Sequence, residues 1–345
     1  MKKINTVIWV SNLSPMSGEG ILARQFLKVF ILKKQKKKVE IKTLQQSFIY
    51  KDSNFFKKKI IEVNSFFHKY LGPIYGAYYL WSNRDKKIIY INYLPLWNFI
   101  IFLLLPKKTI IGPITGGVYY DKVTSFNSFI RKYIFPIFYK ISVFIIYRKF
   151  KRVIFSTDLL KNYIPTSKHR LTLFNFVFSH LSFNNDQKKK INQNKEFDLI
   201  FYNRNHSTKT SVARNSIINF LSKYYKICVI GDFYNNVHVK NFGFVDRNKV
   251  YNIVRKSKAA ITSEENFFSL FVIDCINCNL KIISFNDRFY NSNLKKYFFF
   301  IKKSENFIFI KNTVSKLLNS NIKYNDNFKK NILLHKNRIN NFIKI

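Results

Sequence analysis

Short apolar runs alternate along this chain with longer segments in which apolar residues recur at helical spacing. In the first half, the runs that predict strands are TVIWVSN, VEIKTLQ, IIYIN, TIIGPITGG and RVIFSTD. The segments between them predict helices, among them ILARQFLKVFILKK and a basic aromatic helix over 127–150. Strands that alternate with helices are typical of a parallel sheet with helices on both faces.

The alternation restarts after NNDQKKKINQNK, a polar segment without periodicity that predicts a linker. Strands are then predicted at DLIFYN, KICVIGD, AAIT and NLKIIS, and helices at VARNSIINFLSKYY, NKVYNIVRKS, FFSLFVIDCINC and FKKNILLHKNRINNFI. A chain of 345 residues is long enough for two cores. We therefore expect two doubly wound α/β domains, residues 1–178 and 196–325, with a linker over 179–195 and a last helix over 326–345.

The formal net charge of +42 changes this picture less than its size suggests. Such a charge can indicate a nucleic-acid partner. However, Lys, Asn, Ile, Phe and Tyr all have AT-rich codons and are abundant throughout, so codon bias explains much of the excess. The lysines are scattered and do not interleave with aromatic residues as in an RNA-binding sheet. We expect no specific nucleic-acid partner.

The three cysteines give no disulfide framework, which favours a reducing cytoplasm. Cys275 and Cys278 form a C-x-x-C inside an apolar helix, so core packing is favoured over redox or zinc chemistry. We expect no signal peptide, because MKK leads straight into a strand.

Two apolar segments approach the length of a membrane span. Residues 88–106 are interrupted by Asn92, Pro95 and Asn98, and predict a buried strand, a turn and a buried helix. Residues 133–147 include a lysine and are too short. Both segments can still form a surface that rests on a membrane.

Acidic residues are few, so the adjacent Glu264 and Glu265 stand out at the junction of a predicted strand and helix. In open α/β sheets ligands bind at this edge. We expect the helix to start at Ser269, so that its first N–H groups, including that of Leu270, favour a phosphate, and Asp274 lies further along it. The arrangement predicts a polar, phosphate-bearing ligand.

Two cations supply a partner for such a phosphate. FYNRNHSTKT places Arg204 and Lys209 five residues apart, directly after the strand that opens the second domain. An arginine fork and a lysine point charge can together hold a pyrophosphate. In a lysine-rich chain they can also be ordinary surface cations, but their position after this strand favours a clamp.

These motifs resemble those of the GT-B glycosyltransferases of the large retaining group known as glycosyl transferases group 1, or family 4. The resemblance covers nearly the whole chain and is strongest over 197–284. A motif of the form G-R-x4-K-G holds the donor diphosphate in that family. Arg204 and Lys209 match it, with Asn203 and Thr210 in place of the glycines.

The family's second motif, E-x7-E, resembles the acidic stretch. Its first acid faces the donor sugar, and its second, matched here by Asp274, holds the ribose hydroxyls. Glu265 and Asp274 are nine positions apart instead of eight, which indicates one inserted residue. The choice between Glu264 and Glu265 therefore stays open, and we favour Glu265. The stretch NFGFV, with Gly243, resembles a lead-in that contacts the nucleobase, although plain packing also explains it.

Glycine is rare, and five of the nine glycines fall in two short loops, which indicates positive φ or close backbone approach there. Gly18 and Gly20 resemble the family's first glycine loop, and Gly116 and Gly117 a G-P-x-G-G loop on the cleft side of the first domain. Tight turns are the alternative. Many relatives carry a histidine after the fourth strand, whereas this chain has none there, and His68 is predicted to be a packing or surface residue.

The resemblance implies an α/β GT-B fold, in which two Rossmann-like, doubly wound parallel-sheet domains face a cleft and the C-terminal helix returns to the first domain. It implies a retaining glycosyltransferase that moves a sugar from a nucleotide-diphosphate sugar to a cell-surface glycan, such as lipopolysaccharide, or a lipid-linked acceptor. No cofactor or metal is expected, and Glu265, Arg204 and Lys209 are the expected catalytic residues. The enzyme is expected to be cytoplasmic and peripheral on the anionic inner face of the cytoplasmic membrane.

A second hypothesis is a catalytically degenerate GT-B scaffold that serves as a basic membrane- or RNA-binding protein. Asp274 in place of glutamate, the replaced glycines beside Arg204 and the missing histidine favour it. A nucleotide that raises the melting temperature would support an intact donor site instead.

Overall fold

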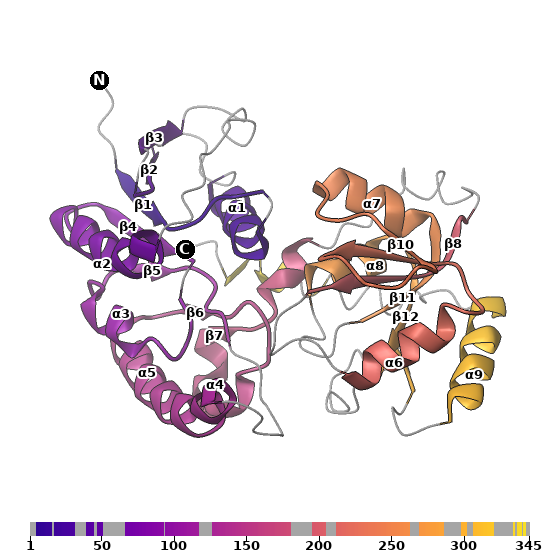
Figure 1. Cartoon of the computed structure of the whole chain (residues 1–345). Coiled ribbons are helices and arrows are strands. Elements are labelled where there is room, and N and C mark those ends of the chain that lie inside the picture. Colours follow the sequence, from indigo (N-terminus) through magenta and orange to yellow (C-terminus); the bar gives the residue numbers. More distant parts are fainter. Residues whose placement is uncertain are drawn as a thin grey trace. The chain divides into compact units, whose positions relative to one another are not determined.

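The chain divides into two compact units, Met1–Ser179 with Lys336–Ile345, and His180–His335 (Figure 1). The structure is a computed structural model. It describes residues 5–15, 17–31, 39–44, 47–50, 66–92, 94–116, 126–180, 195–204, 212–262, 269–285, 298–301, 306–320, 334, 337–339 and 341–342.

The first unit contains a five-stranded sheet of order β3-β2-β1-β4-β5. Its strands are β1 (Thr6–Val10), β2 (Val39–Lys42), β3 (Ser47–Tyr50), β4 (Lys87–Ile91) and β5 (Ile110–Ile111). Neighbouring strands are parallel, except that β3 pairs with β2 in the antiparallel sense. The strand order runs outward in both directions from β1 and β4, as expected of a doubly wound sheet.

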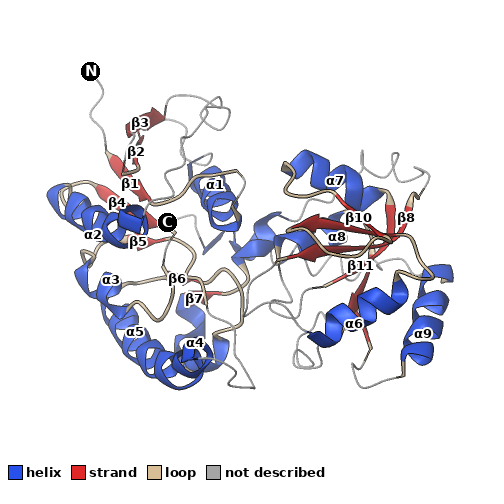
Figure 2. Cartoon of the chain, in the orientation of Figure 1, coloured by secondary structure: helices blue, strands red, loops and turns tan. Residues whose placement is uncertain are grey.

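Helices surround this sheet (Figure 2). They are α1 (Gly18–Ile31), α2 (Phe66–Ser82), α3 (Phe99–Leu104), α4 (Phe126–Phe129), the π-helical turn η2 (Ile130–Ile134) and α5 (Phe135–Lys149). The single helix predicted over 127–150 is therefore wrong in detail. Pro136 has no N–H to continue the α-helical ladder, and Phe135 donates its N–H to the Ile130 carbonyl five residues back.

The segment RVIFSTD forms a strand, as predicted, and this strand lies in a separate two-stranded sheet outside the five-stranded one. Its strand β6 (Val153–Ile154) pairs with β7 (Thr172–Leu173), and an isolated bridge joins Phe155 to Ile114. Short 3-10 helices complete this region at Lys161–Tyr163, Thr166–Leu171 and Phe176–His180.

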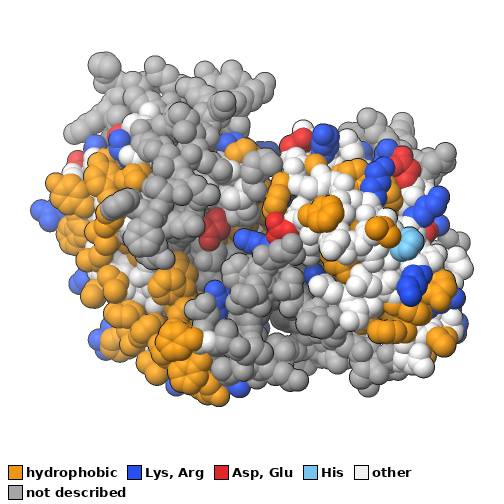
Figure 3. All heavy atoms as spheres, viewed as in Figure 1, with side chains coloured by type: hydrophobic (Ala, Val, Ile, Leu, Met, Phe, Trp, Pro, Cys, Tyr) orange, Lys and Arg blue, Asp and Glu red, His pale blue; other side chains and the backbone are white. Residues whose placement is uncertain are grey.

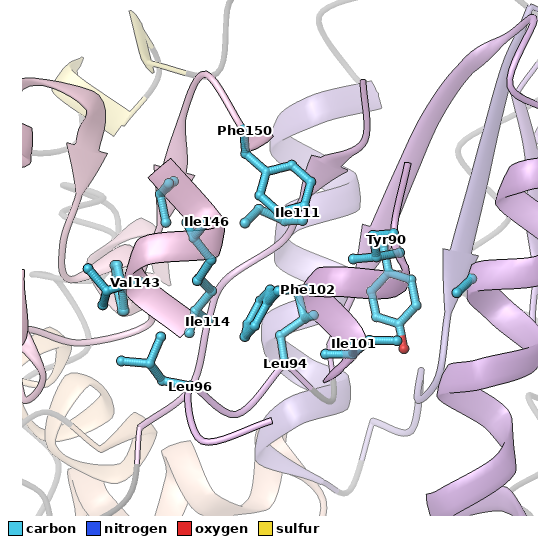
Figure 4. Packing of buried hydrophobic residues seen from close by; sticks show 14 of the residues in the cluster. Tyr90, Leu94, Leu96, Ile101, Phe102, Ile111, Ile114, Val143, Ile146 and Phe150 are labelled. Carbon is cyan, nitrogen blue, oxygen red and sulfur yellow. The ribbon is translucent and has the colours of Figure 1, made fainter. Parts of the chain in front are cut away.

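The core of the first unit joins the sheet to α3 and α5. Figure 4 shows Phe102 of α3 and Ile146 of α5 directed toward one cluster with Tyr90 of β4. The predicted buried helix in 88–106 is only half right, because α3 buries Ile101 and Phe102 but exposes Ile100, Leu103 and Leu104. No helix among the described residues is long and apolar enough to cross a bilayer.

The second unit contains a six-stranded, all-parallel sheet of order β10-β9-β8-β11-β12-β13. Its strands are β8 (Phe197–Asn203), β9 (Ile227–Gly231), β10 (Val239–Asn241), β11 (Ser257–Ile261), β12 (Lys281–Ser284) and β13 (Phe298–Phe300). Its helices are α6 (Val212–Leu221), α7 (Arg247–Arg255), α8 (Leu270–Asn277) and α9 (Phe307–Asn319). This sheet is again doubly wound, with β8 and β11 at its centre.

In the C-terminal segment, Leu334 and residues 337–339 and 341–342 are helical. Residues 337–339 and 341–342 belong to the first unit, whereas Leu334 belongs to the second. Arg152 donates from Nη1 to the carbonyl oxygen of Phe342 at 2.7 Å, and its guanidinium lies 5.2 Å from the centre of that ring.

Candidate functional site

The topology of the second unit singles out one edge of its sheet. The chain leaves β8 toward β9 on one side and returns to the other side at β11, so the loops that follow β8 and β11 diverge from the same place. Such a switch point is where ligands bind in open α/β sheets. The loop after β8 carries Arg204 and Lys209, and the loop after β11 carries Glu264 and Glu265. Motifs 60 residues apart are thus brought to adjacent strand ends.

Not all of these side chains are described. Arg204 follows β8 directly and is exposed. Lys209, Glu264 and Glu265 lie outside the described residues. The evidence for a site therefore comes from Arg204 and from the elements that hold the two loops at their ends.

Asn203 anchors the end of β8. Its Nδ2 donates to the carbonyl oxygens of Asp232 and Phe233, both at 3.2 Å, and its Oδ1 accepts from Arg214 Nη2 at 3.4 Å. Gly231, which pairs with Asn203, has φ +103, and a Cβ there would lie 2.2 Å from the Asn203 carbonyl oxygen. The asparagine that replaces a family glycine therefore braces the strand end from which Arg204 projects.

Arg214 is a second cation beside the loop, and sequence analysis missed it. It lies in the first turn of α6, its residue is only 1% exposed, and its guanidinium is 5.9 Å from the centre of the Phe201 ring. A buried charge next to a helix N-terminus raises the positive potential there. The available signal was an arginine five residues after Lys209, at the start of the next predicted helix.

The start of α8 lies on the other side of the switch point. Ser269 is its N-cap, and its side chain accepts from the Val272 N–H at 3.2 Å, which confirms the predicted helix start. The Tyr202 ring of β8 lies 6.2 Å from the Phe271 ring in the first turn of α8. Leu270, the first helical residue, is partly buried. This contact keeps the N–H groups at the start of α8 close to the end of β8.

Asp274 is buried and paired with an arginine that sequence analysis also missed. Its Oδ1 accepts from Arg247 Nη2 at 2.7 Å, and the two side chains are 5% and 29% exposed. Burial raises the pKa of Asp274 to about 6, while the charge and hydrogen bond of Arg247 act in the opposite direction. Asp246, the N-cap of α7, fixes the start of the helix that carries Arg247. The carboxylate expected to hold ribose thus has a protein partner.

Gly243 lies in the loop between β10 and α7. It has φ +67, and no atom would contact an added Cβ within 4 Å, so only its left-handed backbone requires glycine. Its carbonyl oxygen accepts from the Gly231 N–H at 3.0 Å, which ties this loop to the end of β9.

The first unit has an equivalent switch point between β1 and β4. Asn92, with φ +55, follows β4, and its Oδ1 accepts from the N–H groups of Ser11 at 2.9 Å and Asn12 at 3.1 Å. Asn12 in turn donates from Nδ2 to Ser17 Oγ at 3.0 Å. The loop after β1 is thereby fixed by side chains at both of its ends.

Gly18 and Gly20 lie in the first turn of α1, so their predicted position in a loop is wrong. A Cβ at Gly20 would lie 2.2 Å from the Ser14 carbonyl oxygen, so glycine is needed where the loop folds against the helix. Gly116 has a packing role, because a Cβ there would lie 2.6 Å from Leu160 Cδ1. Gly117 lies outside the described residues.

All three cysteines are free and buried, which confirms the core packing predicted for Cys275 and Cys278. Burial raises the pKa of Cys228 and of Cys278 to about 12, and raises that of Cys275 well above its ordinary value. Within the part of the chain that the structure describes, no three His, Cys, Asp or Glu side chains form a group that could hold a metal ion. His68 lies in α2, and its side chain is not described.

No protein-family model matches the chain, and no curated protein matches its sequence. Solved structures do match. The lipopolysaccharide outer core galactosyltransferase WaaB is 10% identical over 98% of each chain, with a TM-score of 0.53. The sucrose-phosphate synthase of Thermosynechococcus elongatus is 10% identical over 99% of this chain and 92% of that one, with the same TM-score.

A third similar structure is named as an epimerase and not as a transferase. The putative UDP-N-acetylglucosamine 2-epimerase of Listeria monocytogenes is 8% identical over 98% of this chain and 95% of that one, with a TM-score of 0.53. Likeness at such identities concerns the backbone and not the chemistry. The chain has two doubly wound units, and it matches these structures over nearly the full length of each chain. Both observations show that the chain has the GT-B fold.

Proposed function

We propose that this chain is a glycosyltransferase that uses a nucleotide-diphosphate sugar as donor. The observation that carries the proposal is the switch point of the second unit. There Arg204 directly follows β8, and the ring of its neighbour-but-one Tyr202 lies 6.2 Å from the ring of Phe271 in the first turn of α8. The segments that contain Lys209, Glu264 and Glu265 follow the adjacent strands β8 and β11. A transferase and a nucleotide-sugar epimerase are both found among proteins of similar fold, so residue chemistry has to decide the reaction.

The donor diphosphate would be held by charge from several directions. Arg204 offers a planar fork and Lys209 a point charge, while the N–H groups at the start of α8, at Ser269 and Leu270, add the positive end of a helix dipole. Arg214 adds a buried charge next to Asn203 at the end of β8. These groups would stabilise the negative charge that develops on the leaving diphosphate, so no metal ion is required for this role.

The donor's sugar and nucleoside would meet the acidic loop. We assign Glu265 to the sugar, with Glu264 as the alternative, and Gly243 to the approach of the nucleobase. Because Asp274 holds Arg247 at 2.7 Å, we assign it a positioning role at the ribose, where Arg247 is the more exposed of the two side chains. Retention is proposed, with the leaving phosphate taking the proton of the acceptor hydroxyl.

The acceptor class is proposed to be a cell-surface glycan or its lipid-linked precursor, at the cytoplasmic face of the membrane. The name of one structural neighbour, a lipopolysaccharide outer core galactosyltransferase, supports this class but does not identify the sugar.

The direct experiment is a screen of UDP-, GDP- and ADP-sugars that measures thermal stabilisation, donor hydrolysis and sugar transfer. A transferase is expected to be stabilised by one nucleotide and to consume its sugar faster when acceptor is present. Conversion of the sugar without any acceptor requirement would indicate an epimerase. A lack of both stabilisation and turnover across the panel would support the degenerate binding protein.

A further inference from the structure

Three neighbouring helices of the first unit expose apolar side chains along one stripe each. On α2, α3 and α5 these residues recur three or four positions apart, as one side of a helix does. Figure 3 shows hydrophobic side chains gathered over this part of the unit. We call it the apolar–basic face, and its exposed apolar members include Ile74, Tyr78, Ile100, Leu103, Ile137 and Phe144.

The opposite sides of two of these helices are already used by the core. Ile101 and Phe102 of α3, and Val143 and Ile146 of α5, point into the cluster that Figure 4 shows. The exposed stripes therefore form a second apolar surface, separate from the side of each helix that packs in the core. A monomeric soluble protein seldom exposes so much contiguous apolar area unless it binds something.

Direct contacts join the three helices into one surface. Trp81 of α2 donates from Nε1 to the Leu104 carbonyl oxygen at the end of α3, at 2.7 Å. Lys149 of α5 donates to carbonyl oxygens of the same α3 terminus, at 3.1 Å to Phe102 and 2.6 Å to Leu105. The helices are thus held as neighbours, and their stripes lie on a common scaffold.

The helices of this face carry charges of one sign, and Asp85, exposed just beyond α2, lies next to the exposed Arg84 in sequence. The sequences of α2, α3 and the α4–η2–α5 segment contain no Asp or Glu. Lys140 is exposed among the apolar residues of α5, and Lys107 and Lys108 are exposed just beyond α3. The Arg148 guanidinium lies 3.9 Å from the centre of the exposed Phe144 ring, so a cation and an apolar group occupy the same spot.

We propose that the apolar–basic face docks on an anionic lipid bilayer. Apolar stripes flanked by cations are the composition of helices that lie in a membrane interface, and Tyr and Trp rings favour that depth. A second copy of the chain would bring like charges together, and the helices of the face contain no carboxylate to offset them. An anionic lipid surface supplies the opposite charge over the whole area. The proposal goes beyond the transferase reaction and does not depend on it.

The test is sedimentation of the full chain with vesicles, without any donor sugar. Vesicles of phosphatidylcholine alone are compared with vesicles of equal parts phosphatidylcholine and phosphatidylglycerol. The face variant combines Tyr78→Glu with Leu103→Glu. Its matched control combines Val237→Glu with Phe309→Glu, which makes the same kinds of change at exposed apolar residues of the second unit.

A second pair of variants removes charge without touching the apolar stripes. Lys140→Gln with Arg148→Gln is compared with Lys223→Gln and Lys226→Gln, two exposed lysines of the second unit. At about fivefold per cation, Lys140→Gln with Arg148→Gln should bind anionic vesicles about 25-fold more weakly than the wild type. This pair keeps the proposal testable if the glutamate variant fails to fold.

We expect binding to anionic vesicles alone, lost in both face variants and kept in both controls, with unchanged melting temperatures. The proposal is overturned if the face variants bind as the controls do, or if neutral vesicles bind equally well at high salt. It is also overturned if the chain forms a dimer that the face variants dissociate and binds no vesicles. A failed donor screen with intact vesicle binding would overturn the transferase alone.

Discussion

At the scale of single residues, the site depends on side chains that its motifs do not contain. The sequence predicts Arg204 and Lys209 from their spacing, but it gives no sign that Asn203 braces the strand end through three hydrogen bonds. Arg214 and Arg247 were missed for a similar reason. Their importance comes from burial and from partners distant in sequence, which a local pattern does not contain.

Arg204→Ala and Lys209→Ala should each reduce kcat/KM for the donor about 10- to 150-fold. The reason is that a hydrogen bond to a charged group contributes roughly 1.5–3 kcal/mol, and this one strengthens as the diphosphate leaves. Arg204→Lys should restore only part of the loss, since lysine lacks the two-pronged geometry. Steady-state kinetics measures the effect.

The controls for the clamp are Lys188→Ala and Lys189→Ala in the predicted linker, which should leave kcat/KM unchanged. The double variant Arg204→Ala with Lys209→Ala should lose less than the product of the single losses, because both cations share one ligand. If the clamp variants behave like the linker controls, the diphosphate is held elsewhere.

Asp274 should make stability fall as pH rises through a defined window. Its pKa is about 6 in the folded chain and near 4 when unfolded, so between these values the folded state binds a proton that the unfolded state lacks. The free energy of unfolding should decrease by about 2–3 kcal/mol across that window, relative to Asp274→Asn. Denaturant unfolding of both proteins from about pH 4 to pH 7 measures the difference.

Arg247→Gln is the companion variant for this experiment. It removes the attraction that favours the carboxylate, so the decrease should extend to higher pH. The raised pKa would be contradicted if the free energy of unfolding of the wild type stayed constant, or increased with pH, relative to that of Asp274→Asn.

At the scale of elements, strands and helices with strong apolar periodicity were predicted well, whereas short edge strands were not. The strands β1, β4, β8 and β9 and the helix α8 have clear apolar patterns. The edge strands β3 and β13 are too short for a pattern and depend on pairing with their neighbours. The helix α9 was overlooked although its buried Ile310, Val314 and Leu317 follow helical spacing.

A recurring device at this scale is a lysine that closes a helix C-terminus from another element. Lys281 of β12 donates to the carbonyl oxygens of Leu318 at 3.0 Å and Leu317 at 2.5 Å at the end of α9, and burial lowers the pKa of Lys281. Lys149 closes α3, and Lys195 closes α7. A cation at this position satisfies carbonyls left over by the helix and complements its dipole.

Lys281→Met should therefore destabilise the chain by about 1–2 kcal/mol, because it keeps the aliphatic stem and removes only the charged donor. Lys316→Met, at an exposed lysine on α9 itself, is the matched control and should change stability by less than about 0.5 kcal/mol. Equilibrium unfolding in urea measures both. Equal effects in the two variants would mean that the carbonyl contacts of Lys281 contribute nothing specific.

At the scale of the whole molecule, two doubly wound sheets each bring distant loops to one edge. This organisation could be predicted, because alternating strands and helices leave few possible topologies. The identity of the donor sugar in the proposed reaction could not, because the loops that would contact it carry no regular pattern. The fold therefore determines where a ligand binds, and only a few side chains determine which one.

Removal of divalent metal should leave the proposed transfer reaction unchanged. The charge of the leaving diphosphate would be neutralised by Arg204, Lys209 and the N-terminus of α8, so a metal ion has no necessary role. Activity is measured before and after extensive dialysis against EDTA, with and without added Mg²⁺. The informative control is Arg204→Ala, because added Mg²⁺ should raise its residual activity by supplying the charge that was removed. Loss of wild-type activity on dialysis, with recovery on adding Mg²⁺, would show that the metal and not the two cations carries the diphosphate.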